Sequence, residues 1–252
     1  MKNAMTFLPA ACLAFLCLGV TPARAEGGLH GLLLRFDEPA GRRFTDYSGS
    51  GNTITAVGTV TRSTADKVHG ESSVCFDGNG YLQIEPSSDF VFSAALTIDF
   101  WFKSSYTERQ NALSFGDHRD VNNIDFNFSD RDPVGGTSVG FWLFWSSNGW
   151  NRITSGTRLQ YMDGQWHHVA MVRNQGIITS YLDGVSVGSV AYDATLGSPA
   201  RPVHVGAILL NGAVNHQWHG CIDELRVING RALWTSNFDP KLYLPAPLNA
   251  YR

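Results

Sequence analysis

Long apolar runs are scarce in this 252-residue sequence. The first one covers residues 7–20, and it is shorter than the roughly 20 apolar residues that a membrane-spanning helix needs. No later segment approaches that length. We therefore expect no membrane-spanning helix in the chain that follows this run.

Charge is also sparse, and neither sign dominates. The chain has 19 Lys and Arg residues against 22 Asp and Glu residues, for a formal net charge of −3, and no run of basic residues. Nucleic acids and anionic membrane surfaces attract strongly basic patches. The composition therefore argues against both as partners.

The apolar run near the start has the features of a secretory signal peptide. Lys2 precedes it, and Ala23-Arg24-Ala25 follows it as a small-residue cleavage site. We expect cleavage after Ala25, so that residues 26–252 form the mature chain. A retained membrane anchor is the alternative interpretation. The prediction places the protein outside the cell, in the periplasm or on the cell surface.

Cysteine is rare in the mature chain. Cys12 and Cys17 leave with the signal peptide, and Cys75 and Cys221 remain. Two cysteines in an exported protein are read first as one disulfide, because the compartment is oxidising. Two buried free thiols are the alternative. The mature chain also lacks internal repeats and low-complexity linkers, so we expect one domain over residues 26–252, with a Pro-rich C-terminal arm at about residues 239–252.

Local hairpin signals are what the sequence has in abundance. Within residues 163–189, the runs 166–172 and 177–182 are rich in β-branched and aromatic residues and are too short for helices. Asn174-Gln175-Gly176 and Asp183-Gly184 tolerate positive φ, so each predicts a tight antiparallel turn. Three consecutive antiparallel strands indicate an all-β fold.

Five motifs then resemble those of the LamG-like jelly-roll family in the concanavalin A-like lectin/glucanase superfamily. They are D-Y-S-G-S-G-N at residues 46–52, C-F-D-G-N-G-Y-L at 75–82, L-T-I-D-F-W-F-K at 96–103, D-G-Q-W-H-H-V-A at 163–170 and W-H-G-C-I-D-E-L-R-V at 218–227. They occur in the order typical of the family. The resemblance implies a two-sheet antiparallel β-sandwich, a fold that carries lectins, adhesive modules, enzymes and structural domains.

Alternation along residues 96–103 suggests a ligand-binding face. The apolar set at positions 96, 98, 100 and 102 predicts a core-facing side, which leaves Trp101 on the other side between Asp99 and Lys103. An aromatic ring beside short polar groups suits the stacking of a sugar. We expect Trp101, Asp99, Trp142 and Trp150 to bind the ligand, with Trp145 a weaker candidate. The alternative is that these rings pack in the core or in loops.

An acidic loop between residues 115 and 133 suggests a calcium site. Asp117, Asp120, Asn122 and Asp125 supply the oxygen ligands that Ca²⁺ prefers, although their spacing matches no EF-hand. The resemblance supports this prediction, because relatives in the superfamily often carry calcium in such loops. The loop at residues 46–52 is a second candidate source of calcium ligands. The alternative is that Asp and Asn serve here as ordinary turn residues.

Catalytic signatures are missing or out of context. Residues 136–140 and 184–188 match G-x-S-x-G, but both enter predicted strands rather than the strand-to-helix turn that the motif requires. The E-x-D-x-E string of the superfamily's enzymes does not occur, and Asp223-Glu224 is assigned to a structural motif. We therefore predict a non-catalytic, lectin-like module that binds a carbohydrate or cell-surface polymer. The alternatives are a structural or adhesive protein-binding domain, or a glycoside hydrolase with a dispersed site.

The acidic loop generates the first testable prediction. If it holds one calcium ion in the folded state only, millimolar calcium raises the melting temperature of the mature protein relative to a chelator. Differential scanning calorimetry with titration calorimetry measures both effects. An unchanged melting temperature together with no heat of binding would contradict the site.

Overall fold

The computed structural model describes residues 31–41, 43–129, 140–146, 150–154 and 161–243, with the backbone alone for residues 129, 140–146, 150–154 and 243. The predicted signal peptide and most of the C-terminal arm lie outside these ranges. Among the described residues, no helix is long and apolar enough to cross a membrane.

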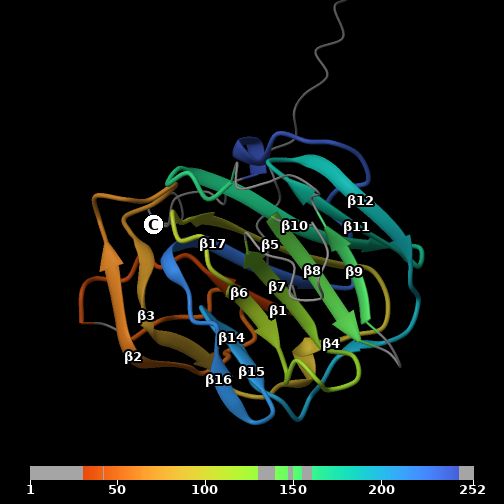
Figure 1. Cartoon of the computed structure of the whole chain (residues 1–252), viewed down its shortest axis with the longest axis horizontal. Helices are drawn as coiled ribbons and strands as arrows, with labels where there is room; N and C mark the ends of the chain where they lie inside the picture. Colours follow the sequence, from red (N-terminus) through yellow and green to blue (C-terminus); the bar gives the residue numbers. More distant parts are fainter. Residues whose placement is uncertain (1–30, 42, 130–139, 147–149, 155–160, 244–252) are drawn as a thin grey trace, which may run out of the picture.

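The fold is an antiparallel β-sandwich, as the sequence predicts. The first layer runs in the order β12-β11-β10-β5-β17, with β1 beside β17. The second runs β3-β14-β6-β7-β8-β9, with β2 beside β3. Pairing of β17 with β3 joins the layers into one sheet that curls over on itself (Figure 1).

The strands of the first layer are β1 (Gly31–Leu34), β5 (Leu96–Lys103), β10 (Trp166–Asn174), β11 (Ile177–Leu182), β12 (Val185–Ala191) and β17 (His219–Asn229). Those of the second are β2 (Ile54–Ser63), β3 (Ser73–Ile84), β6 (Gln110–Phe115), β7 (Ile124–Ser129), β8 (Gly140–Ser146), β9 (Trp150–Thr154) and β14 (Val203–Val205). Two small ribbons pair β4 (Val91–Phe92) with β13 (Leu196–Gly197), and β15 (Ile208–Leu210) with β16 (Ala213–Asn215). The short 3₁₀ turns are η1 (Ser88–Phe90) and η2 (Pro240–Tyr243).

The two predicted hairpins are confirmed, with the predicted turn residues. Gln175 and Gly176 have φ of 48° and 74°, and Asp183 and Gly184 have φ of 49° and 75°. These left-handed conformations match the twist of two-residue hairpin turns, which Gly and Asp tolerate. The local sequence therefore determines this part of the first layer.

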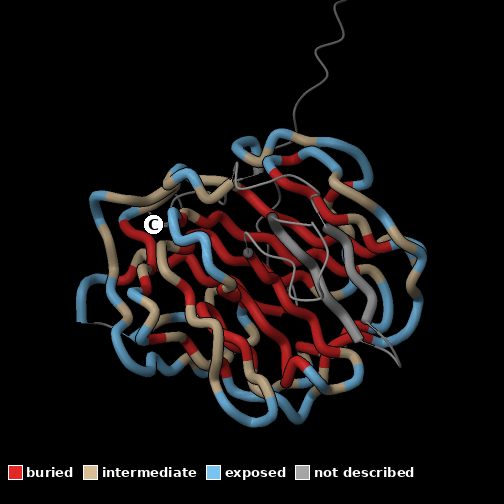
Figure 2. The backbone as a smooth tube through the Cα atoms, in the orientation of Figure 1, coloured by how far each residue is buried: buried red, intermediate tan, exposed pale blue. Residues whose placement is uncertain are grey.

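The core lies between the layers, where β5 packs over β7. The Phe100 and Phe126 rings are 5.2 Å apart between centroids, and the Phe102 and Phe128 rings are 4.6 Å apart. Buried residues follow the central strands of both layers, while exposed residues gather in the connecting loops and along β2 and β12 (Figure 2). The predicted inward set on β5 is therefore confirmed.

The other face of β5 is also buried, which the alternation did not predict. Residues 231–238 follow β17 without regular structure and cover this face. Trp234 and Phe238 stack on each other at 3.8 Å, and His168 contacts both of these rings and that of Trp101. Trp101 is only 5% exposed, so the predicted exposure of its ring is wrong.

The Cys75–Cys221 disulfide is confirmed. The two residues lie directly opposite each other in the β3–β17 pairing, with Cα atoms 4.0 Å apart. They are separated by 146 residues in sequence. The bond therefore holds the junction of the two layers.

A bulge interrupts the pairing of β17 with β5 between Asp223 and Arg226. Asp223 accepts hydrogen bonds from the backbone N–H groups of Val68, His69 and Glu224. Glu224 is 4% exposed, and its carboxylate oxygens have no hydrogen-bond partner among the described residues. Burial raises the pKa of Asp223 to about 7, and burial together with Asp223 raises the pKa of Glu224 to about 9.

The disulfide generates a stability prediction. Replacing both Cys75 and Cys221 with Ser should lower the free energy of unfolding by about 4–5 kcal/mol or somewhat less, because the unfolded chain regains the entropy of a long closed loop. Urea denaturation of the wild-type and double-variant proteins measures the difference. Thiol titration of the denatured, unreduced wild type should find no free thiol at these two residues. Two free thiols would contradict the disulfide.

The buried acid pair generates a pH prediction. In the unfolded chain both groups ionise near pH 4, whereas the folded chain holds their protons to higher pH. The contribution of this pair to the free energy of unfolding should therefore be greatest below about pH 4. It should fall as the pH rises towards 9. Each unit of pKa difference corresponds to about 1.4 kcal/mol.

The Glu224→Gln variant removes one of the two raised titrations, so its free energy of unfolding should fall less steeply between pH 5 and 9 (about the window of the two raised pKa values). Urea denaturation at several pH values measures the slope. The exposed Glu85→Gln variant is the matched control and should follow the wild type. Equal slopes for Glu224→Gln and wild type would contradict the assignment.

Candidate ligand-binding site

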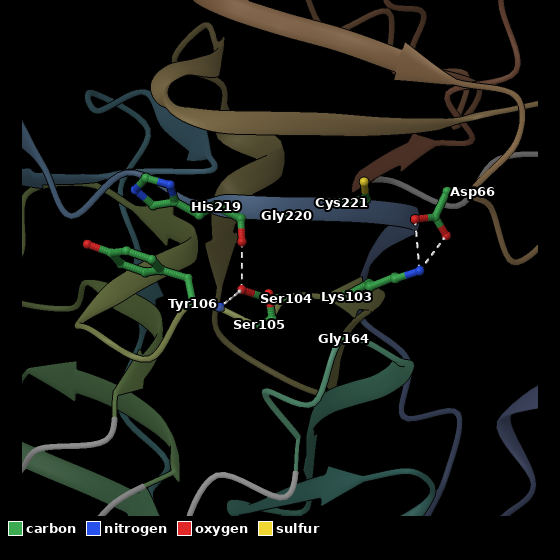
Figure 3. A pocket seen from close by; sticks show the side chains of 9 residues that line it. All are labelled: Asp66, Lys103, Ser104, Ser105, Tyr106, Gly164, His219, Gly220 and Cys221. Carbon is green, nitrogen blue, oxygen red and sulfur yellow. Dashed lines mark hydrogen bonds and ion pairs between the residues drawn. The ribbon is translucent and has the colours of Figure 1, made fainter.

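A hollow of about 420 Å³ opens where β5 ends beside the start of β17. Figure 3 shows that its wall comes from four parts of the chain that are separated in the sequence. The lining residues are Asp66, Lys103, Ser104, Ser105, Tyr106, Gly164, His219, Gly220 and Cys221.

An aromatic pair forms one side of the hollow. The rings of Tyr106 and His219 stack with their centroids 3.9 Å apart and their planes 20° from parallel. Tyr106 remains 37% exposed. Gly78 makes the position of the imidazole possible, because a Cβ at this residue would lie 2.1 Å from the His219 ring. The stack is therefore a fixed, solvent-accessible aromatic surface.

A hydrogen-bond network holds the backbone on both sides of this stack. The Ser104 hydroxyl donates to the carbonyl oxygen of His219 at 2.6 Å and accepts from the Tyr106 N–H at 3.0 Å. Gln110 donates from Nε2 to the Ser104 hydroxyl at 2.9 Å, and its Oε1 accepts from the His219 N–H at 2.8 Å. Ser104 and Gln110 are buried, so the aromatic pair has a rigid support.

The opposite side of the hollow carries a charge pair. Lys103 lies 2.9 Å from the Asp66 carboxylate, and the Trp166 indole N–H donates to the same carboxylate at 2.9 Å. The side chains of Lys103 and Asp66 are about one-third exposed. The pair is locally neutral and offers both a donor and an acceptor to a ligand.

Together these groups suit an uncharged, hydroxylated ligand. Binding sites of this kind combine apolar or aromatic surface with a few placed polar groups that fix the ligand's orientation. Glycoside hydrolysis needs two carboxylates that flank the scissile bond. Asp66 is the carboxylate of this lining, and Lys103 and Trp166 already hold it. As formed by the described residues, this lining therefore holds one carboxylate rather than a flanking pair.

The predicted site around Trp101 and Asp99 lies elsewhere, in the covered outer face of β5. Asp99 is buried and accepts hydrogen bonds from the Arg226 guanidinium at 2.9 Å, with His168 at 3.2 Å. Burial alone would raise the pKa of Asp99, but Arg226 and His168 hold it below its usual value. Asp99 is thus the anchor of an internal ion pair. Lys103, the other predicted polar neighbour of Trp101, does line the hollow.

The side chains of Trp142, Trp145 and Trp150 lie outside the described residues, so their roles stay predictions. Their strands are placed, and the β7–β8 register sets Trp142 opposite Asn127. Asn127 in turn pairs with Asn111 on β6. Both asparagines are fully buried, and their side-chain amide atoms have no hydrogen-bond partner among the residues that the structure describes.

The predicted calcium ligands make protein contacts of their own. Asp117 accepts from the backbone N–H groups of Asn211 and Gly212, which fixes the β15–β16 turn. Burial alone would raise the pKa of Asp117, but backbone hydrogen bonds from Arg119, Gly212 and Asn211 lower it.

Asp120 and Asp125 pair with other side chains. Asp120 lies 2.6 Å from Arg201, and Asp125 lies 2.6 Å from His118. Asn122 adopts a positive φ of 72° in the turn. Within the described ranges, no three His, Cys, Asp or Glu side chains form a metal cluster. Calcium binding by this loop stays a prediction.

The loop at residues 46–52, the second suggested calcium contributor, is organised around Asp46. Its carboxylate accepts from the N–H groups of Leu33, Ser48 and Asn52 and from the Asn52 amide. These bonds fasten the loop against β1. They explain the motif as a structural one.

Sequence reasoning missed Tyr106, His219 and Asp66 as site residues. Tyr106 follows the end of a predicted strand, and His219 precedes Cys221 by two positions. A residue beside a predicted strand end and another beside a predicted disulfide are weak signals by themselves. The stacking of the two rings depends on the register of β17 against β3 and β5.

Comparison with known proteins agrees with the fold. Domain 4 of AbnA, a GH43 extracellular arabinanase from Geobacillus stearothermophilus, in complex with arabinotriose, is similar with a TM-score of 0.60 and 20% identity over 80% of this chain and 92% of that domain. The binding domain of botulinum neurotoxin DC in complex with SialylT has a TM-score of 0.57 and 11% identity, over 84% of this chain and 49% of that one. Domains LG4-5 of the mouse laminin α1 chain have a TM-score of 0.50 and 18% identity, over 68% of this chain and 46% of that one.

At these identities the likeness shows the fold alone. No curated protein sequence matches the chain. The family described as the concanavalin A-like lectin/glucanases superfamily matches residues 76–235, which is more than half of the chain. This chain belongs to the concanavalin A-like lectin/glucanase superfamily.

Proposed function

We propose that the protein is an exported, non-catalytic module that binds a carbohydrate or a cell-surface polymer at the hollow between Tyr106 and Lys103. The observation that carries the proposal is the exposed Tyr106–His219 stack facing a neutral Lys103–Asp66 pair. A sugar ring places its C–H face on an aromatic ring, while its hydroxyls take hydrogen bonds from neighbouring polar groups. The hollow provides both within one lining.

Two further observations support the proposal. A similar solved structure is of an arabinanase domain in complex with arabinotriose, and another is of a toxin binding domain in complex with SialylT. The Cys75–Cys221 disulfide suits an oxidising compartment, which agrees with export through the predicted signal peptide. An adhesive protein-binding role is the alternative that the likeness to laminin domains keeps open.

The test is a glycan array probed with the mature protein from Glu26, with and without calcium, followed by calorimetry with the best ligand and with arabinotriose. Tyr106→Ala should lose about 1–3 kcal/mol of binding free energy, as expected for an aromatic anchor. Its melting temperature should change little, because Tyr106 is exposed. Trp142→Ala and Trp150→Ala test the predicted rings on β8 and β9 in the same assay.

Two variants serve as controls. Tyr81→Ala removes another tyrosine that contacts a histidine ring, His204 at 5.5 Å, but it lies outside the lining of the hollow and should bind normally. Trp101→Ala should cost about 3–5 kcal/mol of folding stability, because it empties a buried site. Unchanged affinity in Tyr106→Ala would refute the site. Release of shortened products from a bound glycan would refute the non-catalytic role.

A further inference from the structure

His167 lies between two carboxylates at the start of β10. Its Nδ1 is 2.8 Å from an oxygen of Asp183, and its Nε2 is 3.2 Å from an oxygen of Asp163. An ionised carboxylate only accepts hydrogen bonds, so both ring nitrogens must donate. A neutral imidazole carries one N–H, whereas the imidazolium carries two. While both carboxylates are ionised, the arrangement therefore favours the positively charged form of His167.

The two carboxylates belong to different turns. Asp163 opens the turn before β10 and also accepts from the Gln165 N–H at 2.8 Å. Asp183 opens the β11–β12 turn and accepts from the His168 N–H at 2.8 Å. The charged ring of His167 thus ties the turn before β10 to the neighbouring hairpin.

The turn before β10 is part of the wall of the hollow. Gly164 lines the hollow, and its N–H donates to the carbonyl oxygen of Ser104 at 3.0 Å. Trp166, two residues further on, holds Asp66 through its indole N–H. The turn therefore contacts the Ser104 side of the hollow, and the strand that it leads into contacts the Asp66 side.

The surroundings of His167 favour its charged form. The other rings against it are Phe102, with centroids 5.9 Å apart, and Tyr161 at 5.2 Å, and neither brings a positive charge. Burial alone would lower the pKa of His167, but Asp183 and then Asp163 raise it above its usual value. We call the imidazolium of His167 with the Asp163 and Asp183 carboxylates the clamp. It is present while both carboxylates are ionised and His167 is protonated, and it is lost as the pH rises through the raised pKa of His167.

We propose that His167 is a positioning residue whose imidazolium holds the Gly164 wall of the hollow, so that ligand affinity falls when this ring loses its proton. The proposal rests on the proposed function for the effect on ligand binding. The effect on the wall itself does not require a ligand. The two parts are therefore tested separately.

The first experiment follows the wall without ligand, by NMR titration of the mature protein between pH 5 and 9 (about the range in which histidine charge changes). The Gly164 amide shift should titrate with the same midpoint as the His167 ring. In His167→Gln, the Gly164 amide should lose this step. A Gly164 amide that titrates identically in wild type and in His167→Gln would overturn the proposal, whatever the ligand.

The second variant is Asp163→Asn, which keeps the size of the side chain and removes one of the two charges. The midpoint of the His167 ring and of the Gly164 amide should move together to lower pH. A midpoint that stays at its wild-type value in this variant would contradict the clamp. This result holds even if His167→Gln fails to fold.

The ligand part is measured with the best glycan from the array, or with arabinotriose, by calorimetry across the same pH range. Affinity of the wild type should fall by about three- to tenfold as His167 is deprotonated, since the neutral ring keeps one N–H and one of the two charge-assisted hydrogen bonds at the wall is lost. His167→Gln should bind weakly at every pH and should lack this step.

The outcomes separate the two proposals. A wild type that binds no glycan at any pH, while the Gly164 amide titrates as predicted, would refute the proposed function and leave the clamp intact. A wild type that binds with equal affinity across the titration of His167 would refute the link between the clamp and the ligand.

Discussion

Pairing of β17 with strands of both layers is the interaction on which the rest of the structure depends. β17 bonds to β3 along its first residues and to β5 along most of its length. Since β3 belongs to one layer and β5 to the other, this strand converts a single hydrogen-bonded sheet into a closed sandwich. The Cys75–Cys221 disulfide links β3 to β17 covalently where these two strands pair. The bulge at Asp223 lies just beyond it.

The hollow is a direct product of this junction. Cys221 pairs in register with both Cys75 and Lys103, and His219 precedes it by two residues. The imidazole of His219 thereby meets Tyr106, which follows the end of β5. Four supporting hydrogen bonds through Ser104 and Gln110 keep these two segments at a fixed spacing. The lining residues of the hollow lie at strand ends and in the loops beside them, and these hydrogen bonds hold Tyr106 and His219 in place, which suits a binding site that is largely preformed.

A second apolar cluster, separate from the core between the layers, covers the outer face of the first layer. Strands β5, β10 and β11 place apolar and aromatic groups on both faces, so one face would remain in water without a cover. Residues 231–238 supply that cover through Trp234 and Phe238, and Phe238 bonds back to Gly184 through its N–H. Asp99 and Arg226 are sealed beneath it as an ion pair. A polar pair in such a place needs full pairing, because an unpaired buried charge is costly.

The sequence by itself determined the features that short-range chemistry controls. The turns at Gln175-Gly176 and Asp183-Gly184 require residues that accept positive φ, and the alternation along β5 assigns its inward phenylalanines. The cysteine pairing followed from having two cysteines in a chain expected to be exported. Only the tertiary structure decided that Trp101 is covered and that Tyr106, His219, Asp66 and Gly164 meet. The reason is that alternation gives the face of a residue but not what packs on that face, and contacts between distant segments depend on strand register, which no local pattern in this chain specifies.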